Sequence, residues 1–165
     1  AVKRLTGSMP DILLVLTGHG SAENDLRKLA KNLDIEKNVR FAGFLTLSAL
    51  AEYYKASDMF VIMSTAETQS LALMQAFATG LPAIGARSHG LKEYLKPECG
   101  YQIEPGDDKT LSEKILYLFE HKDVSELMGR AGLKYVFEFS PERIASAWEK
   151  IFMEAIEKYY ASRKQ

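Results

Sequence analysis

Short apolar runs alternate along most of the chain with stretches whose apolar residues recur every three or four positions. The first run, 11–16, is continuously apolar and stops at a glycine-rich turn, which predicts a central strand buried on both faces of a parallel sheet. Residues 22–33 then carry apolar positions at helical spacing among charged ones and predict an amphipathic helix laid on that sheet. The same alternation predicts strands at 39–42, 59–63, 83–86 and 101–103, and helices at 48–55, 70–79 and 91–95.

Only helices are predicted beyond the turn at 105–108. Two cover 111–121 and 124–138, and a long one at 141–162 starts with Ser140 as N-cap and Pro141 at the first helical position. Apolar residues of this last helix form one stripe between Ile144 and Tyr159. The stripe is longer than a short sheet requires, so part of it is expected to pack on something else.

Strands separated by helices of 8 to 12 residues predict an α/β fold with right-handed crossovers, a Rossmann-like doubly wound parallel sheet. Ligands of such sheets bind beyond the carboxyl ends of the strands, so the functional residues are expected in the loops there. No repeat, linker or low-complexity tract divides the chain, and we expect one domain over residues 1–165.

Amino-acid composition and net charge exclude several classes of protein. With 47% hydrophobic and 26% charged residues, the chain is typical of a globular domain and unlike disordered or coiled-coil proteins. Twenty-one basic against 22 acidic residues leave a net charge of −1, which argues against nucleic-acid binding. The single cysteine, Cys99, cannot form an internal disulfide, and neither a signal peptide nor an 18-residue apolar run is present, so a cytoplasmic location is expected.

The first candidate site is the turn Gly18-His19-Gly20 between the first strand and helix. Bare backbone and helix N–H groups there can meet a phosphate or a sugar. A dinucleotide-binding fingerprint needs a third glycine where this chain has Glu23, and no P-loop string occurs, so both of those classes are disfavoured. A plain tight turn without a ligand explains the two glycines equally well.

The second candidate is residues 64–76, where polar side chains end an apolar strand and open a helix. The helix start offers its amides and positive dipole end to a diphosphate, Glu67 can accept hydrogen bonds from sugar hydroxyls, and Gln75 can make a further polar contact. This is the favoured site for an extended ligand carrying an anion beside a sugar. The alternative is that Glu67 and Ser70 merely cap the helix while Gln75 faces solvent.

The remaining polar residues have structural explanations. Asp107 and Asp108 precede a helix, where capping accounts for them, and no histidine or third carboxylate is adjacent in sequence. His121 complements a helix end. Cys99 needs no role. We therefore predict no metal site.

Seven segments in order resemble the retaining nucleotide-sugar glycosyltransferases of the GT-B fold, specifically their C-terminal, donor-binding half. The matching segments are 16–20, 39–44, 56–61, 64–67, 75–82, 89–93 and 100–101. Together they extend over nearly the whole chain. The resemblance implies a nucleotide-diphospho-sugar donor, transfer to a saccharide or lipid acceptor with retention, and no cofactor or metal.

The resemblance also assigns roles. Glu67 matches the first of two family glutamates separated by seven residues and takes the catalytic position near the sugar, while Gln75 stands where the second glutamate binds the ribose. This glutamine can hydrogen-bond a diol but lacks the charge that strengthens such bonds. The other donor-binding residues implied are Gly18, His19, Gly20, Gly43, Phe44, Thr68, Gln69, Ser70, Leu71 and His89. Glu67-Thr68-Gln69 looks more like members that glycosylate lipids.

The family's N-terminal acceptor domain is absent from the chain, as is a strand-loop-helix from which members supply an Arg and a Lys to the diphosphate. The resemblance implies that the last helix crosses back to that domain. It also allows peripheral contact with the inner face of a membrane. Two alternatives stay open: a catalytically inactive interaction or regulatory domain, indicated by Gln75, and a nucleotide-sugar epimerase of similar fold.

Overall fold

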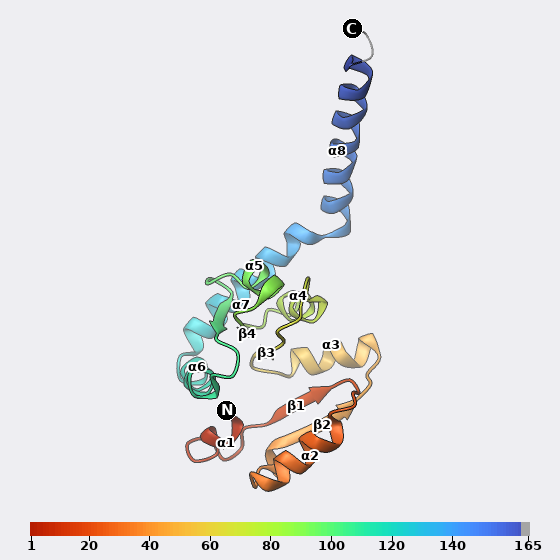
Figure 1. The fold of residues 1–165 in the computed structure, drawn as a ribbon. Coiled ribbons are helices and arrows are strands. Elements are labelled where there is room, and N and C mark those ends of the chain that lie inside the picture. Colours follow the sequence, from red (N-terminus) through yellow and green to blue (C-terminus); the bar gives the residue numbers. More distant parts are fainter. Residues whose placement is uncertain (163–165) are drawn as a thin grey trace.

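A computed structural model describes residues 1–162, in which helices surround short parallel strands (Figure 1). The first half contains α1 (Val2–Leu5), β1 (Leu14–Thr17), α2 (Glu23–Asn32), the 3-10 turn η1 (Glu36–Asn38), β2 (Val39–Gly43), α3 (Leu47–Lys55), β3 (Phe60–Ile62) and α4 (Leu71–Ala78). The second half contains β4 (Ala83–Ala86), α5 (His89–Tyr94), β5 (Gly100–Ile103), α6 (Asp108–Glu120), α7 (Lys122–Val136), the 3-10 turn η2 (Phe137–Phe139) and α8 (Pro141–Ser162).

All strand pairs in the described chain are parallel, and a helix connects each strand to the next. β1 pairs with β2, and β3, β4 and β5 pair in that order. This arrangement confirms the predicted Rossmann-like α/β class. The predicted elements all exist, and the last helix has the predicted bounds. The helix predicted at 91–95 begins earlier, at His89, because Ser88 leaves extended backbone there (φ −144°, ψ 145°).

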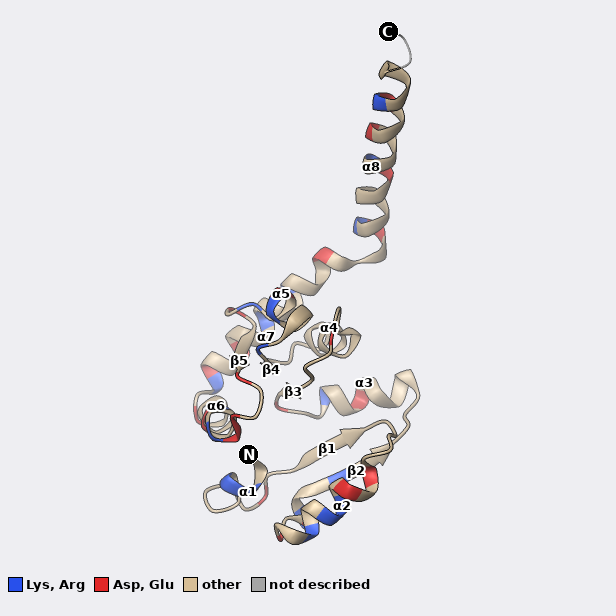
Figure 2. Cartoon of the chain, viewed as in Figure 1, with Lys and Arg blue, Asp and Glu red and all other residues tan. Residues whose placement is uncertain are grey.

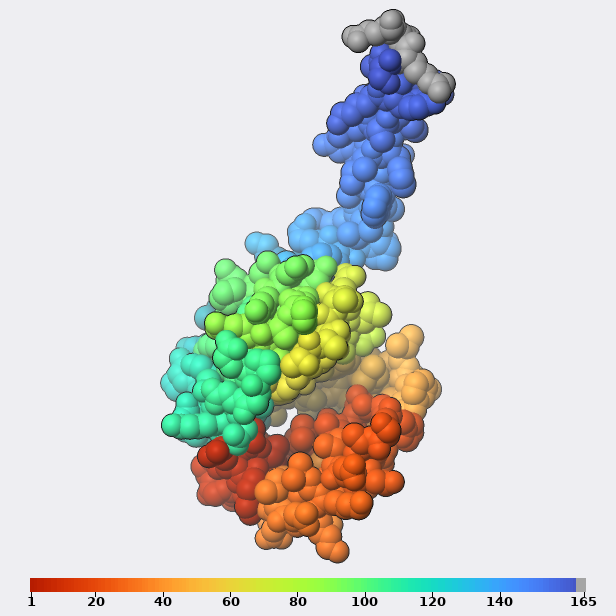
Figure 3. Space-filling model, in the orientation of Figure 1, coloured from red at the N-terminus to blue at the C-terminus, as the bar shows by residue number. Residues whose placement is uncertain are grey.

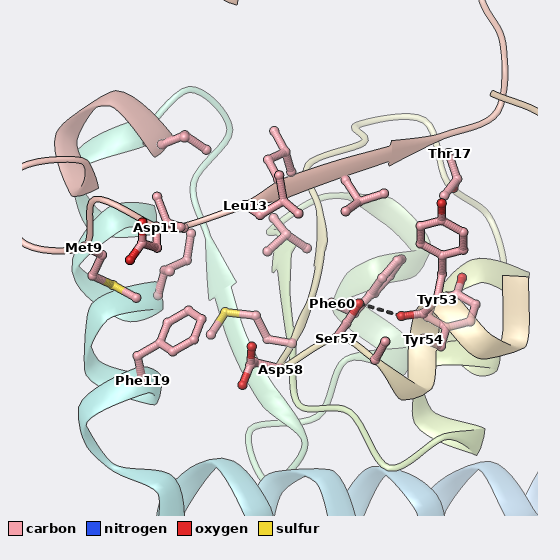
Figure 4. Close-up of a pocket in the computed structure, with 18 of the residues that line it drawn as sticks. Met9, Asp11, Leu13, Thr17, Tyr53, Tyr54, Ser57, Asp58, Phe60 and Phe119 are labelled. Carbon is pink, nitrogen blue, oxygen red and sulfur yellow. Dashed lines mark hydrogen bonds between the residues drawn. The ribbon is translucent and has the colours of Figure 1, made fainter. Parts of the chain in front are cut away.

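The prediction that the first strand is central and buried on both faces is wrong. Within residues 1–162, β1 has only β2 as a hydrogen-bonded neighbour, none of its residues is buried, and Leu13 just before it is 52% exposed. Its apolar residues instead face a cavity that separates β1 from β3 (Figure 4). Three of its four residues are half-buried, and among the described residues no strand pairs with its outer edge.

The main core lies on the other sheet, between α4, β4, α5 and α7. Leu73 and Phe77 of α4 and Leu91 of α5 are fully buried within one cluster. The helices α4 and α7 approach closely, since a Cβ added at Gly132 would lie 2.5 Å from the Phe77 ring. Dense packing of this kind fixes the position of α4 and of the loop that precedes it.

The helix α8 extends away from the rest of the molecule (Figure 1). Its start is as predicted, since Ser140 Oγ accepts a hydrogen bond from the Arg143 amide at 3.4 Å. None of its residues is buried, and Trp148 and Phe152 on the apolar stripe are 54% and 59% exposed. Acidic and basic residues are interspersed along α8, whereas on α2 the acidic residues precede the basic ones (Figure 2). None of the helices in residues 1–162 has the length and apolarity needed to span a bilayer.

Candidate donor site

The first turn of α4 follows the carboxyl end of β3 and is accessible to a ligand. Ser70 is 2% exposed and its Oγ accepts a hydrogen bond from the Leu73 amide at 3.3 Å, which confirms the N-cap interpretation of this residue. The first amides of a helix have no acceptor within the helix, so those of Leu71 and Ala72 are available to a ligand. The side chain of Leu71 is 72% exposed, so this end of the helix is not covered.

The loop from Ser64 to Gln69, which carries Glu67, is fastened to the start of α5. Ser88 Oγ donates to the Ser64 carbonyl oxygen at 2.8 Å, and the Gly90 amide donates to the Glu67 carbonyl oxygen at 3.0 Å. A Cβ at Gly90 would lie 1.7 Å from the Thr68 carbonyl oxygen. Only glycine therefore allows the two backbones this approach.

A cavity of about 560 Å³ lies between this loop and α5. Glu67 and Thr68 line one wall and His89 lines the other. In the described chain the Glu67 carboxylate makes no hydrogen bond and no ion pair, so it can accept hydrogen bonds from a ligand. His89 is exposed and has a φ of +29°, a conformation that is uncommon outside glycine.

Sequence reasoning missed four residues that line this cavity: Thr65, Ala66, Gly90 and Glu93. Glu93 lies four residues after His89 on α5, and that helical spacing is the signal that could have found it. Gly90 lies within the matching segment 89–93, which assigns it no role. Its close approach to Thr68 depends on the fold and has no signature in the sequence.

The residues predicted near the nucleotide form a second group, at the ends of β1 and β2. The Gly18 amide donates to the Gly43 carbonyl oxygen at 2.7 Å, and both glycines have positive φ, +92° and +67°. The His19 ring lies against Gly43, 3.2 Å from where a Cβ would stand. Phe44 follows with 81% of its surface exposed. One backbone hydrogen bond thus joins the loop that follows β1 to the end of β2.

His19 also contacts the following helix. Its Nδ1 lies 3.3 Å from Glu23 Oε2, and Glu23 accepts two hydrogen bonds from Arg27, at 3.0 and 2.7 Å. The bonds from Arg27 first, and from His19 second, lower the pKa of the Glu23 carboxyl. The Glu23 carboxylate therefore orients the His19 ring.

The two groups are not part of one cavity: the residues that line the cavity beside Glu67 do not include Gly18, Gly20 or Phe44. Gln75 lies one turn into α4 and is half-buried, while Gln69 is exposed. What the groups share is their place at the carboxyl ends of parallel strands, where ligands of such sheets bind.

Of the two aspartates for which capping was predicted, only Asp107 caps the helix. Asp107 caps α6 by accepting hydrogen bonds from the Thr110 amide at 2.9 Å and the Thr110 hydroxyl at 2.6 Å, which lower the pKa of the carboxyl. Asp108 accepts from Arg4. The Cys99 thiol is 2% exposed, and burial raises its pKa to about 11. No group of three or more metal-ligating side chains is present in residues 1–162.

Comparison with known proteins decides the family. The glycosyl transferases group 1 family matches residues 1–135. The chain belongs to this family. It is 32% identical over 148 residues to the N-acetyl-alpha-D-glucosaminyl L-malate synthase of Bacillus anthracis, a match that covers 88% of this chain and 38% of that one. It is 29% identical over 145 residues to the alpha-monoglucosyldiacylglycerol synthase of Streptococcus pneumoniae, covering 88% and 32%.

Among solved structures, the pneumococcal O-GlcNAc transferase GtfA in complex with UDP and GlcNAc superposes with a TM-score of 0.80 at 23% identity, covering 94% of this chain and 32% of that one. The fold is that of the C-terminal half of GT-B glycosyltransferases, as the sequence predicts. The match spans only 38% and 32% of the length of these two curated relatives.

Proposed function

We propose that this chain is the donor-binding half of a retaining, metal-independent glycosyltransferase that uses a nucleotide-diphospho-sugar. The observation that carries the proposal is an unpartnered carboxylate, Glu67, that lines a cavity at the carboxyl edge of a parallel sheet, three residues before the uncovered start of α4 at Ser70. The site thus offers hydrogen-bond donors for an anion next to an acceptor for hydroxyls.

The diphosphate is assigned to the first turn of α4. The amides of Ser70 and Leu71, together with the positive end of the helix dipole, favour an anion there. In the transition state negative charge grows on the departing diphosphate, and fixed amide dipoles stabilise it without reorganising. The Ser70 cap and the buried Leu73 and Phe77 hold these amides in place.

The sugar is assigned to the cavity. Glu67 accepts hydrogen bonds from its hydroxyls and orients the anomeric carbon, so that the acceptor attacks on the face from which the diphosphate leaves. His89 and Thr68 line the same space and contact the sugar from either side. Glu93 adds a second carboxylate that can accept hydrogen bonds from hydroxyls.

The nucleoside is assigned to the remaining predicted residues. Gln75 hydrogen-bonds the ribose, and the backbone at Gly43 and Phe44 lies beside the base. Gly18, His19 and Gly20 approach the phosphates from the end of β1. Gln75 binds a ribose diol more weakly than a carboxylate would, because it brings no charge.

The acceptor side is assigned to an N-terminal domain outside this chain, in the cytoplasm. One relative is named a synthase of monoglucosyldiacylglycerol and another a synthase of glucosaminyl malate, so both lipid and small polar acceptors occur among the relatives. Together with the sequence Glu67-Thr68-Gln69, the first name favours a lipid acceptor and peripheral contact with the inner face of a membrane.

Amide-resolved NMR of this chain, titrated with UDP, GDP and ADP without divalent metal, tests the proposal. We expect shifts concentrated in residues 18–20, 43–45 and 67–75, with one nucleotide preferred. Silence of all three loops at millimolar concentrations of every nucleotide would contradict the proposal and favour the inactive, regulatory alternative.

The substitution Glu67→Gln separates the sugar from the nucleotide. Because Glu67 is assigned to the sugar, the variant should bind the free nucleotide as the parent does and the matching nucleotide-sugar about tenfold more weakly, the value of one charge-assisted hydrogen bond. Glu98→Gln, an exposed glutamate that does not line the cavity, is the control. An equal loss of affinity for the nucleotide and the nucleotide-sugar would contradict the assignment of Glu67 to the sugar.

A further inference from the structure

The short helix α5 provides the wall of the candidate sugar cavity that lies opposite Glu67. Its residues His89 and Glu93 are one helical turn apart, and both line this cavity. In the described chain neither side chain has a hydrogen bond or an ion pair within the protein, so both are available to a ligand. The space-filling view shows the green segments around α5 beside the yellow segment that leads into α4 (Figure 3). The position of α5 therefore decides the width of the cavity.

This helix depends on its surroundings for its position. It contains six residues, and a helix of that length is not stable in water without tertiary contacts. Its start is fastened to the loop that carries Glu67 by the Ser88 hydroxyl and the Gly90 amide, at 2.8 and 3.0 Å. Its apolar side is fixed by Leu91 and Leu95, which are both fully buried. These contacts leave the carbonyl groups at the other end of α5 without donors.

The side chain of Gln102 binds that other end. Its Nε2 donates hydrogen bonds to the carbonyl oxygens of Leu95 at 2.7 Å and of Lys92 at 3.3 Å. Carbonyl groups at the end of a helix have no intrahelical donor, and within residues 1–162 no backbone amide donates to either of these oxygens. The amide group of Gln102 therefore satisfies both carbonyl groups and ties the end of α5 to β5.

The part of the sheet to which Gln102 ties α5 is itself well fixed. Gln102 pairs in register with Gly85 of β4, the middle strand of the sheet formed by β3, β4 and β5. A Cβ added at Gly85 would lie 2.8 Å from Leu95 Cδ2, so the Leu95 side chain lies directly on β4 at this point. Leu95 is thus held twice, through its side chain by packing on Gly85 and through its carbonyl oxygen by Gln102.

We propose that Gln102 is a positioning residue for the sugar half of the donor site. It does not line the cavity, so it acts through α5 and keeps His89 and Glu93 at their distance from Glu67. Hydrogen bonds to hydroxyl groups weaken when the donor–acceptor distance exceeds about 3.0 Å, so a small displacement of α5 removes contacts to the sugar. This inference rests on the proposed function, because the cavity receives a sugar only if the chain binds a nucleotide-sugar.

The nucleotide half of the site does not depend on Gln102. The first turn of α4 is fixed by the Ser70 cap and by the buried side chain of Leu73. The group at Gly18 and Gly43 lies on the other sheet, at the ends of β1 and β2. Loss of the Gln102 hydrogen bonds is therefore expected to weaken binding of the sugar and to leave binding of the free nucleotide unchanged. A purely structural role would lower both affinities together, or neither.

Three substitutions of Gln102 test the proposal. Gln102→Met keeps the unbranched length of the side chain but has no donor, and Gln102→Glu carries a carboxylate that can only accept hydrogen bonds. Gln102→Lys restores a donor for carbonyl groups at a helix end. Calorimetry measures the affinity for the nucleoside diphosphate that this chain prefers and for the matching nucleotide-sugar, which is UDP-glucose for UDP, GDP-mannose for GDP or ADP-glucose for ADP.

We expect Gln102→Met and Gln102→Glu to bind the free nucleotide within about twofold of the parent and the nucleotide-sugar about tenfold more weakly, the value of one lost hydrogen bond. Gln102→Lys should bind both ligands nearly as the parent does, because the donor is restored. The amide resonances of residues 89–95 should shift in Gln102→Met and Gln102→Glu even without a ligand, since the end of α5 moves.

Ser57→Ala is the matched control, because it removes a hydroxyl that donates to the Tyr53 carbonyl oxygen at the end of α3, at 2.7 Å. It should leave both affinities unchanged. Equal losses of affinity for the nucleotide and the nucleotide-sugar in Gln102→Met and Gln102→Glu, or no loss for either ligand, would overturn the proposal. Failure of the parent chain to bind any of the nucleotides would contradict the proposed function and, with it, this inference.

Discussion

At the scale of single residues, the glycine at position 90 has the most direct control over the site. Its amide holds the Glu67 carbonyl oxygen, and a Cβ there would lie 1.7 Å from Thr68. We predict that Gly90→Ala destabilises the domain by about 1–3 kcal/mol, the usual cost of overpacking, and shifts the amide resonances of residues 64–70. Gly7→Ala, at a glycine with open space around it, is the control for denaturant unfolding. Equal stability of both variants would contradict the close backbone contact between Gly90 and the loop that carries Glu67.

The thiol of Cys99 provides a second prediction for a single residue. With a pKa near 11 in the folded chain and about 8.5 when unfolded, its thiolate fraction at pH 8 is about 200-fold lower in the folded state. Because the folded pKa is raised, the associated stability is present at neutral pH and lost as the pH rises toward 11. Alkylation at pH 8 should therefore be at least 200-fold slower than in denaturant. Rapid labelling of the folded chain would contradict this burial.

At the scale of helices and strands, the hydrophobic pattern predicted the type and order of every strand and of every α-helix from α2 onward, because each carries its own periodicity, whereas it missed α1 and the two 3-10 turns. Ser140 and Pro141 even fixed the start of α8. The exception is the burial of β1. An apolar run indicates that a strand prefers buried faces, whereas its actual burial depends on the elements that pack against it, and within residues 1–162 β1 pairs only with β2.

The last helix allows a prediction for an element. None of its residues is buried, so it contributes little to the folded domain. Deleting residues 141–165 should change the free energy of unfolding by less than about 0.5 kcal/mol, as for surface changes generally. Far-UV circular dichroism during denaturation measures this change. A large loss of stability would mean that α8 packs on the domain, against the exposure of Trp148 and Phe152.

At the scale of the whole molecule, the candidate site was predictable in part. Glu67, Thr68 and His89 were predicted and share one cavity, since each follows a strand at the carboxyl edge of the sheet. Glu93 and Gly90 were not, because the first faces the cavity only through the position of α5 and the second acts through a backbone approach. The Gly18 and Gly43 group lies on the other sheet, formed by β1 and β2.

The measurement that tests the central claim most directly is the affinity of Leu71→Pro for the preferred nucleoside diphosphate. Proline is tolerated at the first position of a helix, and Ser70 before it is already extended (φ −82°, ψ 103°), so α4 should remain intact. The substitution removes the Leu71 amide, one of the two amides assigned to the diphosphate. We predict affinity at least about tenfold weaker than that of Leu71→Ala, which keeps the amide. Equal affinities with α4 intact would contradict the placement of the donor at this helix.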